Sequence, residues 1–304
     1  MLTSLSELVE RASNEVHGMR VVLAAGDDAH ALEGIKDVAE LGVVRPLITG
    51  DRAAIEACLN EVGFEVAPED IYDAADVNEA AARAVELVRE GKADFIMKGK
   101  MQTSELLRAV VNKEHGLGRG RTMSHMALNE VPAYHKLLVT TDGGMLLAPS
   151  LEQKRDVILN AIEALHALGY EEPKVGVLAA AEKVNPKSVD STDAAALKEQ
   201  WEAGEIPGCI LEGPISLDLA LVVERSAQKG YESPVAGDVD VLVVPNITCG
   251  NVLGKTLVEM AGAKMVGLVV GAACPIVLTS RGSSAEEKRN SLCLAALMSN
   301  KGGE

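Results

Sequence analysis

Short apolar, β-branched runs alternate with helical periodicity along most of this 304-residue chain. RVVLAAG (20–26) and RPLITG (45–50) are typical of strands, whereas AHALEGIKDVAELG (29–42) places its apolar residues at helical spacing. The junctions are mostly Gly, Pro, Asn or Asp, which favour turns. Such alternation predicts an α/β fold, with a mostly parallel sheet and helices on both of its faces.

The same alternation continues to the C-terminal end, where a last helix is expected from about Ser284. Further strands are predicted by ADFIMKG (93–99), HKLLVTTDGG (135–144), PKVGVLAA (173–180), CILEG (209–213), VDVLVVP (239–245), KMVGLVVG (264–271) and PIVLTS (275–280). The stretch 115–136 is the least regular one. It fits an ordinary loop, an active-site loop or a crossing between domains, and the chain length suits about two domains.

The composition mainly excludes classes of function. The formal net charge of −16 opposes broad attraction to nucleic acid or to an anionic membrane, and 2% aromatic residues are too few for base-stacking platforms. The longest apolar run is broken by Gly267, Gly271 and Pro275, and it is shorter than the roughly 18 to 20 residues of a membrane span. MLTSLSELVERASNEVHGMR reads as an amphipathic helix rather than a secretion signal. We expect a soluble protein.

The cysteines indicate a reducing compartment. They are scattered, odd in number and without a CxxC motif: Cys58, Cys209, Cys249, Cys274 and Cys293. This usage suits the cytoplasm and argues against a disulfide framework or structural zinc.

Ligands of open α/β sheets bind beyond the carboxyl ends of the strands, so the polar loops after strands are the places to search. Lys98 and Lys100 flank Gly99 at one strand end, and Thr103 or Ser104 is placed to cap the next helix. Basic side chains beside the free amides of a helix start favour an anion site. Simple solvation of the two lysines is the competing interpretation.

A second loop follows VDVLVVP. Its polar groups, Asn246, Thr248, the Gly250 amide and Asn251, can surround a phosphate or a carbonyl, and the helix is expected to begin near Gly250 or Asn251. The residues 254–256 superficially resemble the end of a P-loop, but the GxxxxGK[ST] spacing is absent. We therefore expect these three residues inside the helix.

Two aspartates also stand beside strand ends. Asp142 lies in TTDGG (140–144), and Asp218 lies in GPISLD (213–218). Either carboxylate can serve a ligand. Asp142 equally suits an Asx-turn, and Asp218 equally suits the first turn of a helix.

The last strand-end loop, TSRGSSAEEK (279–288), contains a capping pattern and an unexplained arginine. Ser284 with Glu287 matches the S-x-x-E capping box, and Ser283 with Glu286 matches it one residue earlier. Arg281 adds positive charge where the helix dipole is already positive, which is unfavourable unless an anion binds there. The pattern predicts a ligand with phosphate or carboxylate character.

Several of these stretches together resemble the phosphate acetyl/butyryltransferase family, most closely its phosphate butyryltransferase branch, over nearly the whole chain. The matching stretches are MKGKMQTSELLRAV, SHMALNEVPAYHKLLVTTDGGMLLAPSLEQK, EKVNPK with STDAA, EGPISLDLA, SPVAGDVDVLVVPNITCGNVLGK and TSRGSSAEEKRNSL. Their common order and spacing carry the resemblance, because no single stretch is specific.

The resemblance implies a cytoplasmic enzyme for acyl-CoA + phosphate = acyl phosphate + CoA, by direct attack in a ternary complex, without metal or redox cofactor. It also implies the two-domain αβα sandwich of the isocitrate/isopropylmalate dehydrogenase-like type, with the active site in the interdomain cleft. One domain would comprise 1–128 and 272–304, and a second, 129–271, would form a homodimer or higher homo-oligomer.

By position, Ser280 and Arg281 match the family's active-site Ser-Arg pair. Glu287 falls where acetyltransferases carry an aspartate proposed as base for the CoA thiol. Arg281 would hold phosphate bidentately, and Ser280 would stabilise the tetrahedral oxyanion. Butyryl-type relatives often read SRADS where this chain has SRGSS, which is closer at Gly282 to the acetyl type. The acyl group, butyryl or acetyl, stays open.

Two other functions remain as alternatives. A metal-dependent decarboxylating dehydrogenase of the same fold would need a dinucleotide fingerprint, and GLGRG (116–120) is not GxGxxG. A non-catalytic acyl-CoA or phosphate-binding sensor would bind these ligands without turnover.

Overall fold

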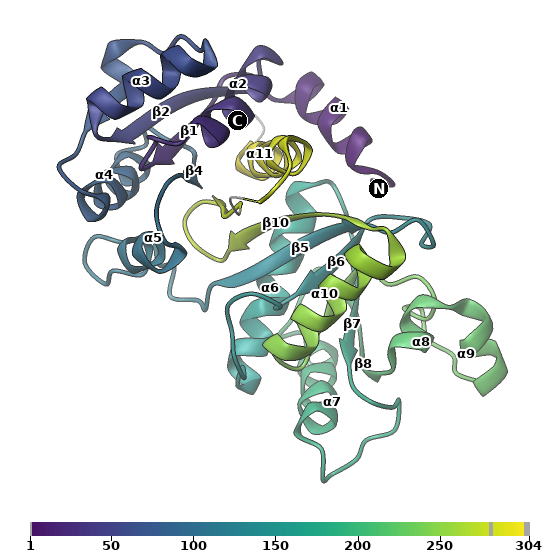
Figure 1. Ribbon diagram of the computed structural model, residues 1–304. Helices are drawn as coiled ribbons and strands as arrows, with labels where there is room; N and C mark the ends of the chain where they lie inside the picture. The colour runs from purple at the N-terminus through teal and green to yellow at the C-terminus, as the bar shows by residue number, and fades with distance from the viewer. Residues whose placement is uncertain (1, 280–281, 301–304) are drawn as a thin grey trace. The chain divides into compact units, whose positions relative to one another are not determined.

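The computed structural model describes residues 2–279 and 282–300 and divides into two compact units. The terminal unit comprises Leu5–Arg121 and the segment from Val266 onward, drawn in purple to blue and in yellow in Figure 1. The central unit comprises Thr122–Met265 with the residues before Leu5. Both units are mixed α/β, so the predicted fold class is confirmed at this level.

The terminal unit contains a sheet in the order β3-β2-β1-β4-β11-β10. Neighbouring strands are parallel except for β10 and β11. In chain order its elements are α1 (Leu5–Glu15), β1 (Met19–Ala24), α2 (Ala29–Glu40), β2 (Val44–Gly50), α3 (Arg52–Val62), a 3-10 turn (Pro68–Asp70), β3 (Ile71–Asp73), α4 (Val77–Arg89), β4 (Phe95–Lys98), α5 (Thr103–Val110), β10 (Lys264–Val270), β11 (Ile276–Val277) and α11 (Ala285–Ser299).

Strand order places the helices of the terminal unit on two faces. The chain moves outward from β1 through β2 to β3 and then returns to β4. Because such crossovers are right-handed, α2 and α3 cover one face and α4 covers the other (Figure 1). Helix α11 packs against α1 and α2, and α5 packs against α4.

The central unit contains strands in the order β5-β6-β9-β7-β8, all parallel except that β5 runs antiparallel to β6. Helices α6 and α7 contact these strands, and α10 contacts β6. Its elements are β5 (Ser124–Glu130), β6 (Leu138–Thr141), α6 (Leu151–Ala167), β7 (Lys174–Leu178), α7 (Val189–Glu202), β8 (Ile210–Ile215), α8 (Leu217–Leu221), α9 (Val223–Lys229), β9 (Val241–Val243) and α10 (Ile247–Ala261).

The irregular stretch 115–136 contains strand β5, which the sequence pattern did not reveal. Its residues, SHMALNE, mix polar and apolar types because Ser124 and Asn129 are buried and hydrogen-bonded rather than replaced by aliphatic side chains. The three-residue strand β3 was also too short to leave a pattern. The stretch 216–230 forms two short helices, α8 and α9, because the backbone of Val222 between them is extended.

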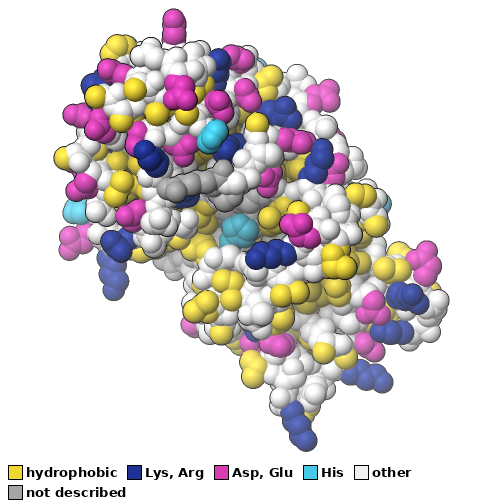
Figure 2. Space-filling model, viewed as in Figure 1, with side chains coloured by type: hydrophobic (Ala, Val, Ile, Leu, Met, Phe, Trp, Pro, Cys, Tyr) yellow, Lys and Arg dark blue, Asp and Glu magenta, His cyan; other side chains and the backbone are white. Residues whose placement is uncertain are grey.

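The core is aliphatic, as the composition predicts. Val22, Leu23 and Ile48 are fully buried in the terminal sheet, and Val241 and Leu242 are fully buried in the central one. Acidic and basic side chains are interspersed over the upper part of the face shown in Figure 2. Each helix in the described part of the chain is too short or too polar to cross a lipid bilayer.

A buried ion network fixes the amino-terminal edge of the central strands. Lys136, 2% exposed, lies 2.9 Å from Asp238 Oδ1 and 2.7 Å from Asp240 Oδ1. Burial raises the pKa of Asp238, but hydrogen bonds from Lys174, Lys136 and His135 outweigh it and hold that pKa well below its usual range. These ion pairs connect the starts of β6, β7 and β9. Because the three strands are parallel, their carboxyl ends are thereby aligned at the opposite edge of the sheet.

Candidate functional site

The carboxyl ends of β6, β9, β7 and β8 meet at one edge of the central sheet, because these strands are parallel. Strand β5 is antiparallel and therefore begins at this edge. Asp142 follows β6 and Asn246 follows β9, while His125 lies at the start of β5. The topology thus brings together two predicted loops and one residue that the sequence did not single out.

Asp142 organises the turn after β6. Its carboxylate is 3% exposed, and Oδ1 accepts the backbone N–H of Gly144 at 2.7 Å and of Met145 at 2.8 Å. Oδ2 accepts the backbone N–H of His125 at 2.9 Å. The Gly144 bond is the one that defines an Asx-turn. The carboxylate is committed to the protein backbone, which favours the structural interpretation of Asp142.

The two glycines after Asp142 allow this turn to touch α10. A Cβ atom on Gly143 would lie 2.9 Å from the carbonyl carbon of Gly250, and one on Gly250 would lie 2.6 Å from Gly143 Cα. Side chains cannot enter at these distances, so both positions require glycine for close packing of backbone on backbone. The turn and the first turn of α10 therefore form one rigid contact.

Helix α10 begins earlier than the sequence predicted. It starts at Ile247, not near Gly250 or Asn251, because Asn246 acts as N-cap: its Oδ1 accepts the N–H of Cys249 at 3.0 Å. Gly250 is buried within the first turn, whereas Thr248 and Asn251 are exposed. The positive end of the helix dipole is thus presented at this edge, which suits an anion.

The segment 254–256 lies inside α10, as predicted, and Lys255 is exposed. This position confirms that GKT here is not the end of a P-loop. The five cysteines, all within the described residues, are free thiols, and Cys249 among them is exposed.

His125 is the residue of this edge that sequence reasoning missed. Its Nδ1 is buried without a hydrogen-bond partner among the described residues, and a Cβ on Gly144 would lie 2.9 Å from its Cγ. Burial lowers the pKa of His125, and the nearby charge of Asp142 acts in the opposite direction without reversing the shift. The imidazole is therefore neutral near pH 7. The sequence did not single out His125, because no strand was predicted within the irregular stretch 115–136.

Asp218 lies apart from these groups. Strands β9 and β7 separate β8, which precedes it, from β6. Its carboxylate accepts the hydroxyl of Ser216 at 2.6 Å and the ammonium of Lys229 at 3.0 Å. The hydrogen bond from Ser216, followed by that from Lys229, lowers the pKa of Asp218 to about 2. The surroundings favour a local role in the first turn of α8.

In the terminal unit, Lys98 and Lys100 already have protein partners. Lys98 Nζ donates to the carbonyl oxygens of Gly99 and Met101 at 3.2 Å each. Lys100 Nζ donates to Asp27 at 3.0 Å, and this hydrogen bond and charge raise the pKa of Lys100. A bound anion at this loop would therefore compete with Asp27 for Lys100.

The cap of the following helix, α5, differs from the prediction. Gln102 is the N-cap, so Thr103 is the first helical residue and neither Thr103 nor Ser104 caps. The Gln102 N–H donates to Glu105 at 2.7 Å, which supplies the glutamate of a capping box. The predicted cap position, Thr103 or Ser104, was wrong, because glutamine is an unusual N-cap and was not considered.

Glu287 forms the predicted capping box at the start of α11. Its Oε2 accepts the Ser284 N–H at 2.7 Å, and the Glu287 N–H donates to Ser284 Oγ at 3.1 Å. The alternative pair, Ser283 with Glu286, does not form the cap. Ser280 and Arg281 lie outside the described residues.

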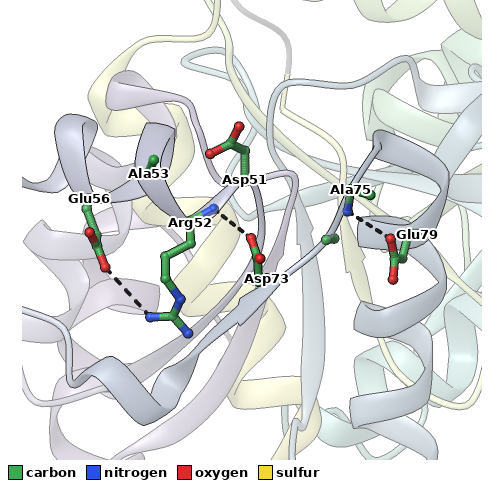
Figure 3. A pocket seen from close by; sticks show the side chains of 8 residues that line it. Asp51, Arg52, Ala53, Glu56, Asp73, Ala75 and Glu79 are labelled. Atoms are coloured by element: carbon green, nitrogen blue, oxygen red, sulfur yellow. Dashed lines mark hydrogen bonds and ion pairs between the residues drawn. The ribbon is translucent and has the colours of Figure 1, made fainter.

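A hollow of about 590 Å³ lies at the ends of β2 and β3 (Figure 3). Its charged lining is mostly acidic, and several groups are paired: Asp73 accepts the Arg52 N–H at 3.0 Å, and Glu79 accepts the Ala75 N–H at 2.8 Å. This charge opposes a phosphate. Within residues 2–279 and 282–300, no three His, Cys, Asp or Glu side chains gather in a way that fits a metal ion.

The carboxyl edge of the central sheet thus combines strand-end loops with a helix N-terminus, as is typical of α/β proteins that bind anionic ligands. Comparison with known proteins agrees: the profile of the phosphate acetyl/butaryl transferase family matches residues 71–296. The chain is 39% identical to the phosphate butyryltransferase of Clostridium acetobutylicum, over 98% of this chain and 99% of that protein. This chain therefore belongs to the phosphate acetyl/butaryl transferase family.

Two further comparisons bear on the branch. The chain is 38% identical to the phosphate acetyltransferase of Thermotoga maritima, over 96% of this chain and 99% of that protein. The crystal structure of a branched-chain phosphotransacylase from Enterococcus faecalis superposes with a TM-score of 0.79 at 33% identity, covering 92% of this chain and 99% of that one. Relatives named for different acyl groups are thus similarly close.

The glycine contact between the turn and α10 leads to a matched prediction. Gly250→Ala should lower the free energy of unfolding by about 1–3 kcal/mol, because its Cβ meets the Gly143 backbone. Gly254→Ala, in the same helix, has its nearest neighbour at 3.9 Å and should stabilise by about 1 kcal/mol through helix propensity. Urea denaturation of both variants checks this, and equal effects of the two substitutions would contradict it.

Proposed function

We propose that this protein transfers a short-chain acyl group, butyryl or acetyl, between coenzyme A and inorganic phosphate. Family membership, with 39% identity over 98% of the chain, is the observation that carries the proposal. An oxygen of HPO₄²⁻ attacks the thioester carbonyl, a carbon–oxygen bond forms, and the carbon–sulfur bond breaks. The phosphate proton ends on the CoA sulfur, so the products are acyl phosphate and CoA thiol.

Direct attack in a ternary complex needs positioning more than activation, because phosphate is already a nucleophile. Arg281 would hold two phosphate oxygens, and Ser280 would stabilise the oxyanion. The exposed Thr248 and Asn251 at the start of α10 support a role for this helix end in binding the anion. Lys100 would contribute charge on release from Asp27.

The same family relationship supports a proposal for the remaining architecture. We infer an active site in a cleft between two domains, 1–128 with 272–304 and 129–271, in the isocitrate/isopropylmalate dehydrogenase-like arrangement. We propose that the protein uses neither a metal nor a redox cofactor, and the acyl transfer itself involves no change of oxidation state. A cytoplasmic location, without nucleic-acid or membrane partners, agrees with the net charge of −16.

A homodimer is supported by helix α10. Only Gly250 and Leu257 of its residues are buried, although the helix is predominantly apolar. Val252 and Met260 are 60% and 83% exposed, and with Cys249 and Thr256 they recur at helical spacing as an uncharged stripe. Exposed apolar stripes of this kind mark protein–protein contacts. Dimerisation would bury the uncharged stripe of α10 against a second copy of the chain.

Charge in this stripe should disrupt the dimer. Met260→Glu places a carboxylate in an apolar contact, which costs several kcal/mol unless it is paired. Sedimentation velocity should show a dimer for the wild type and a monomer for the variant. Lys255→Glu changes charge on the same helix outside the stripe and should remain dimeric. A monomeric wild-type protein would reject the homodimer.

Catalysis itself is tested by thiol release from acyl-CoAs of increasing chain length, with and without phosphate. The transferase should release CoA only when phosphate is present, and the chain length with the highest kcat/KM identifies the acyl group. A binding sensor would instead show ligand-induced stabilisation without turnover. A dehydrogenase would change NAD(P) absorbance in the presence of a metal.

Glu287→Gln separates capping from proton transfer. Glutamine keeps the bond to Ser284 but cannot accept a proton, so a base at this position predicts a loss of about 10²–10⁴ in kcat with an unchanged melting temperature. Ser284→Ala removes one partner of the cap and leaves the carboxylate. If Glu287→Gln turns over at the wild-type rate, Glu287 is a cap alone.

A further inference from the structure

The imidazole of His125 has no hydrogen-bond partner among the described residues on either ring nitrogen, although its backbone is fully engaged. The His125 N–H donates to Asp142 at 2.9 Å, and the His125 carbonyl accepts the Thr141 hydroxyl at 2.8 Å. The ring is held at one end of β5, with Nδ1 buried against Gly144. The side chain as a whole is partly exposed, so Nε2 is the nitrogen on its accessible side.

The surroundings of Nδ1 decide which nitrogen carries the proton. No acceptor among the described residues lies within hydrogen-bonding distance of Nδ1, and the nearby Asp142 carboxylate accepts backbone N–H groups instead. A proton on Nδ1 would therefore be a buried donor without an acceptor, which is rarer and costlier in proteins than an unused acceptor lone pair. The favoured tautomer has its proton on Nε2 and presents an N–H donor to the accessible side.

The same two glycines connect this donor to helix α10. The backbone of Gly144 lies against the His125 ring, and that of Gly143 lies against Gly250 and Asn251. The ring and the first turn of α10 therefore flank one dipeptide at the carboxyl edge of the sheet. A helix N-terminus and a side-chain donor therefore both lie at this edge.

We propose that His125 is a further catalytic residue of the acyl transfer, and that its Nε2–H donates a hydrogen bond to the acyl carbonyl oxygen as that oxygen becomes the oxyanion. This inference rests on the proposed function. A carbonyl is the fitting acceptor because a phosphate dianion would favour the imidazolium form, which burial opposes. The histidine neither gives up nor takes a proton in this role.

The test compares three substitutions that differ in which nitrogen they replace. The amide nitrogen of glutamine reaches the position of Nε2, that of asparagine reaches the position of Nδ1, and leucine replaces neither. His125→Gln should keep kcat within about tenfold of the wild type, whereas His125→Asn and His125→Leu should lose about a hundredfold or more in kcat. The KM for acyl-CoA should change little, because the bond strengthens in the transition state.

Several kinetic outcomes overturn the inference. They are wild-type kcat in all three variants, equal activity of the Asn and Gln variants, or a Gln variant as slow as the Leu variant, which would indicate a base. If the wild type itself shows no phosphate-dependent CoA release, the proposed function fails, and that result is visible without any variant.

A measurement on the wild-type protein covers the case in which the variants do not fold. In ¹⁵N-histidine-labelled protein at pH 7, the His125 ring should show a protonated Nε2 and an unprotonated Nδ1. Its signals are assigned by their loss in His125→Gln or, failing that, by their broadening in Gly144→Ala, whose Cβ meets the ring. A protonated Nδ1, in either the neutral ring or the imidazolium, overturns the inference.

Discussion

The central unit depends on one buried carboxylate that accepts three backbone hydrogen bonds. Asp142 is almost fully buried, and a buried charge is tolerated only where hydrogen bonds replace its lost hydration. Its three donors come from the turn after β6 and from the start of β5. The bonds fix Gly143 and Gly144, and through them both α10 and the His125 ring. Every proposed ligand contact of this edge follows from that turn.

The two edges of the central sheet have opposite chemistry. The buried Lys136 pairs with the buried Asp240 and with the partly exposed Asp238 at the amino edge, so the charge of Lys136 is satisfied internally. The carboxyl edge instead presents the N-terminus of α10. This division is compatible with the proposed binding of an anion by a chain of net charge −16, because a helix dipole acts at short range, whereas the charge of distant surface groups is screened by salt.

The sequence predicted most elements, since hydrophobic periodicity reports burial directly. It placed Asp142 at a strand end and offered an Asx-turn as one interpretation, and the structure contains that turn. The bond from His125 was not predictable, because it comes from the antiparallel β5. It misplaced the cap of α5, which is Gln102 rather than Thr103 or Ser104. It also placed the start of α10 near Gly250 or Asn251, whereas Asn246 caps the helix. His125 was missed for a tertiary reason: its significance lies in its contact with Gly144, and no spacing encodes that contact.

The capping box at α11 and a base at the same residue are physically compatible. Glu287 uses Oε2 to accept the Ser284 N–H, and a carboxylate has a second oxygen, Oε1, with lone pairs of its own. The cap also restricts the side-chain rotamer, which reduces the entropy lost when a thiol is aligned for deprotonation.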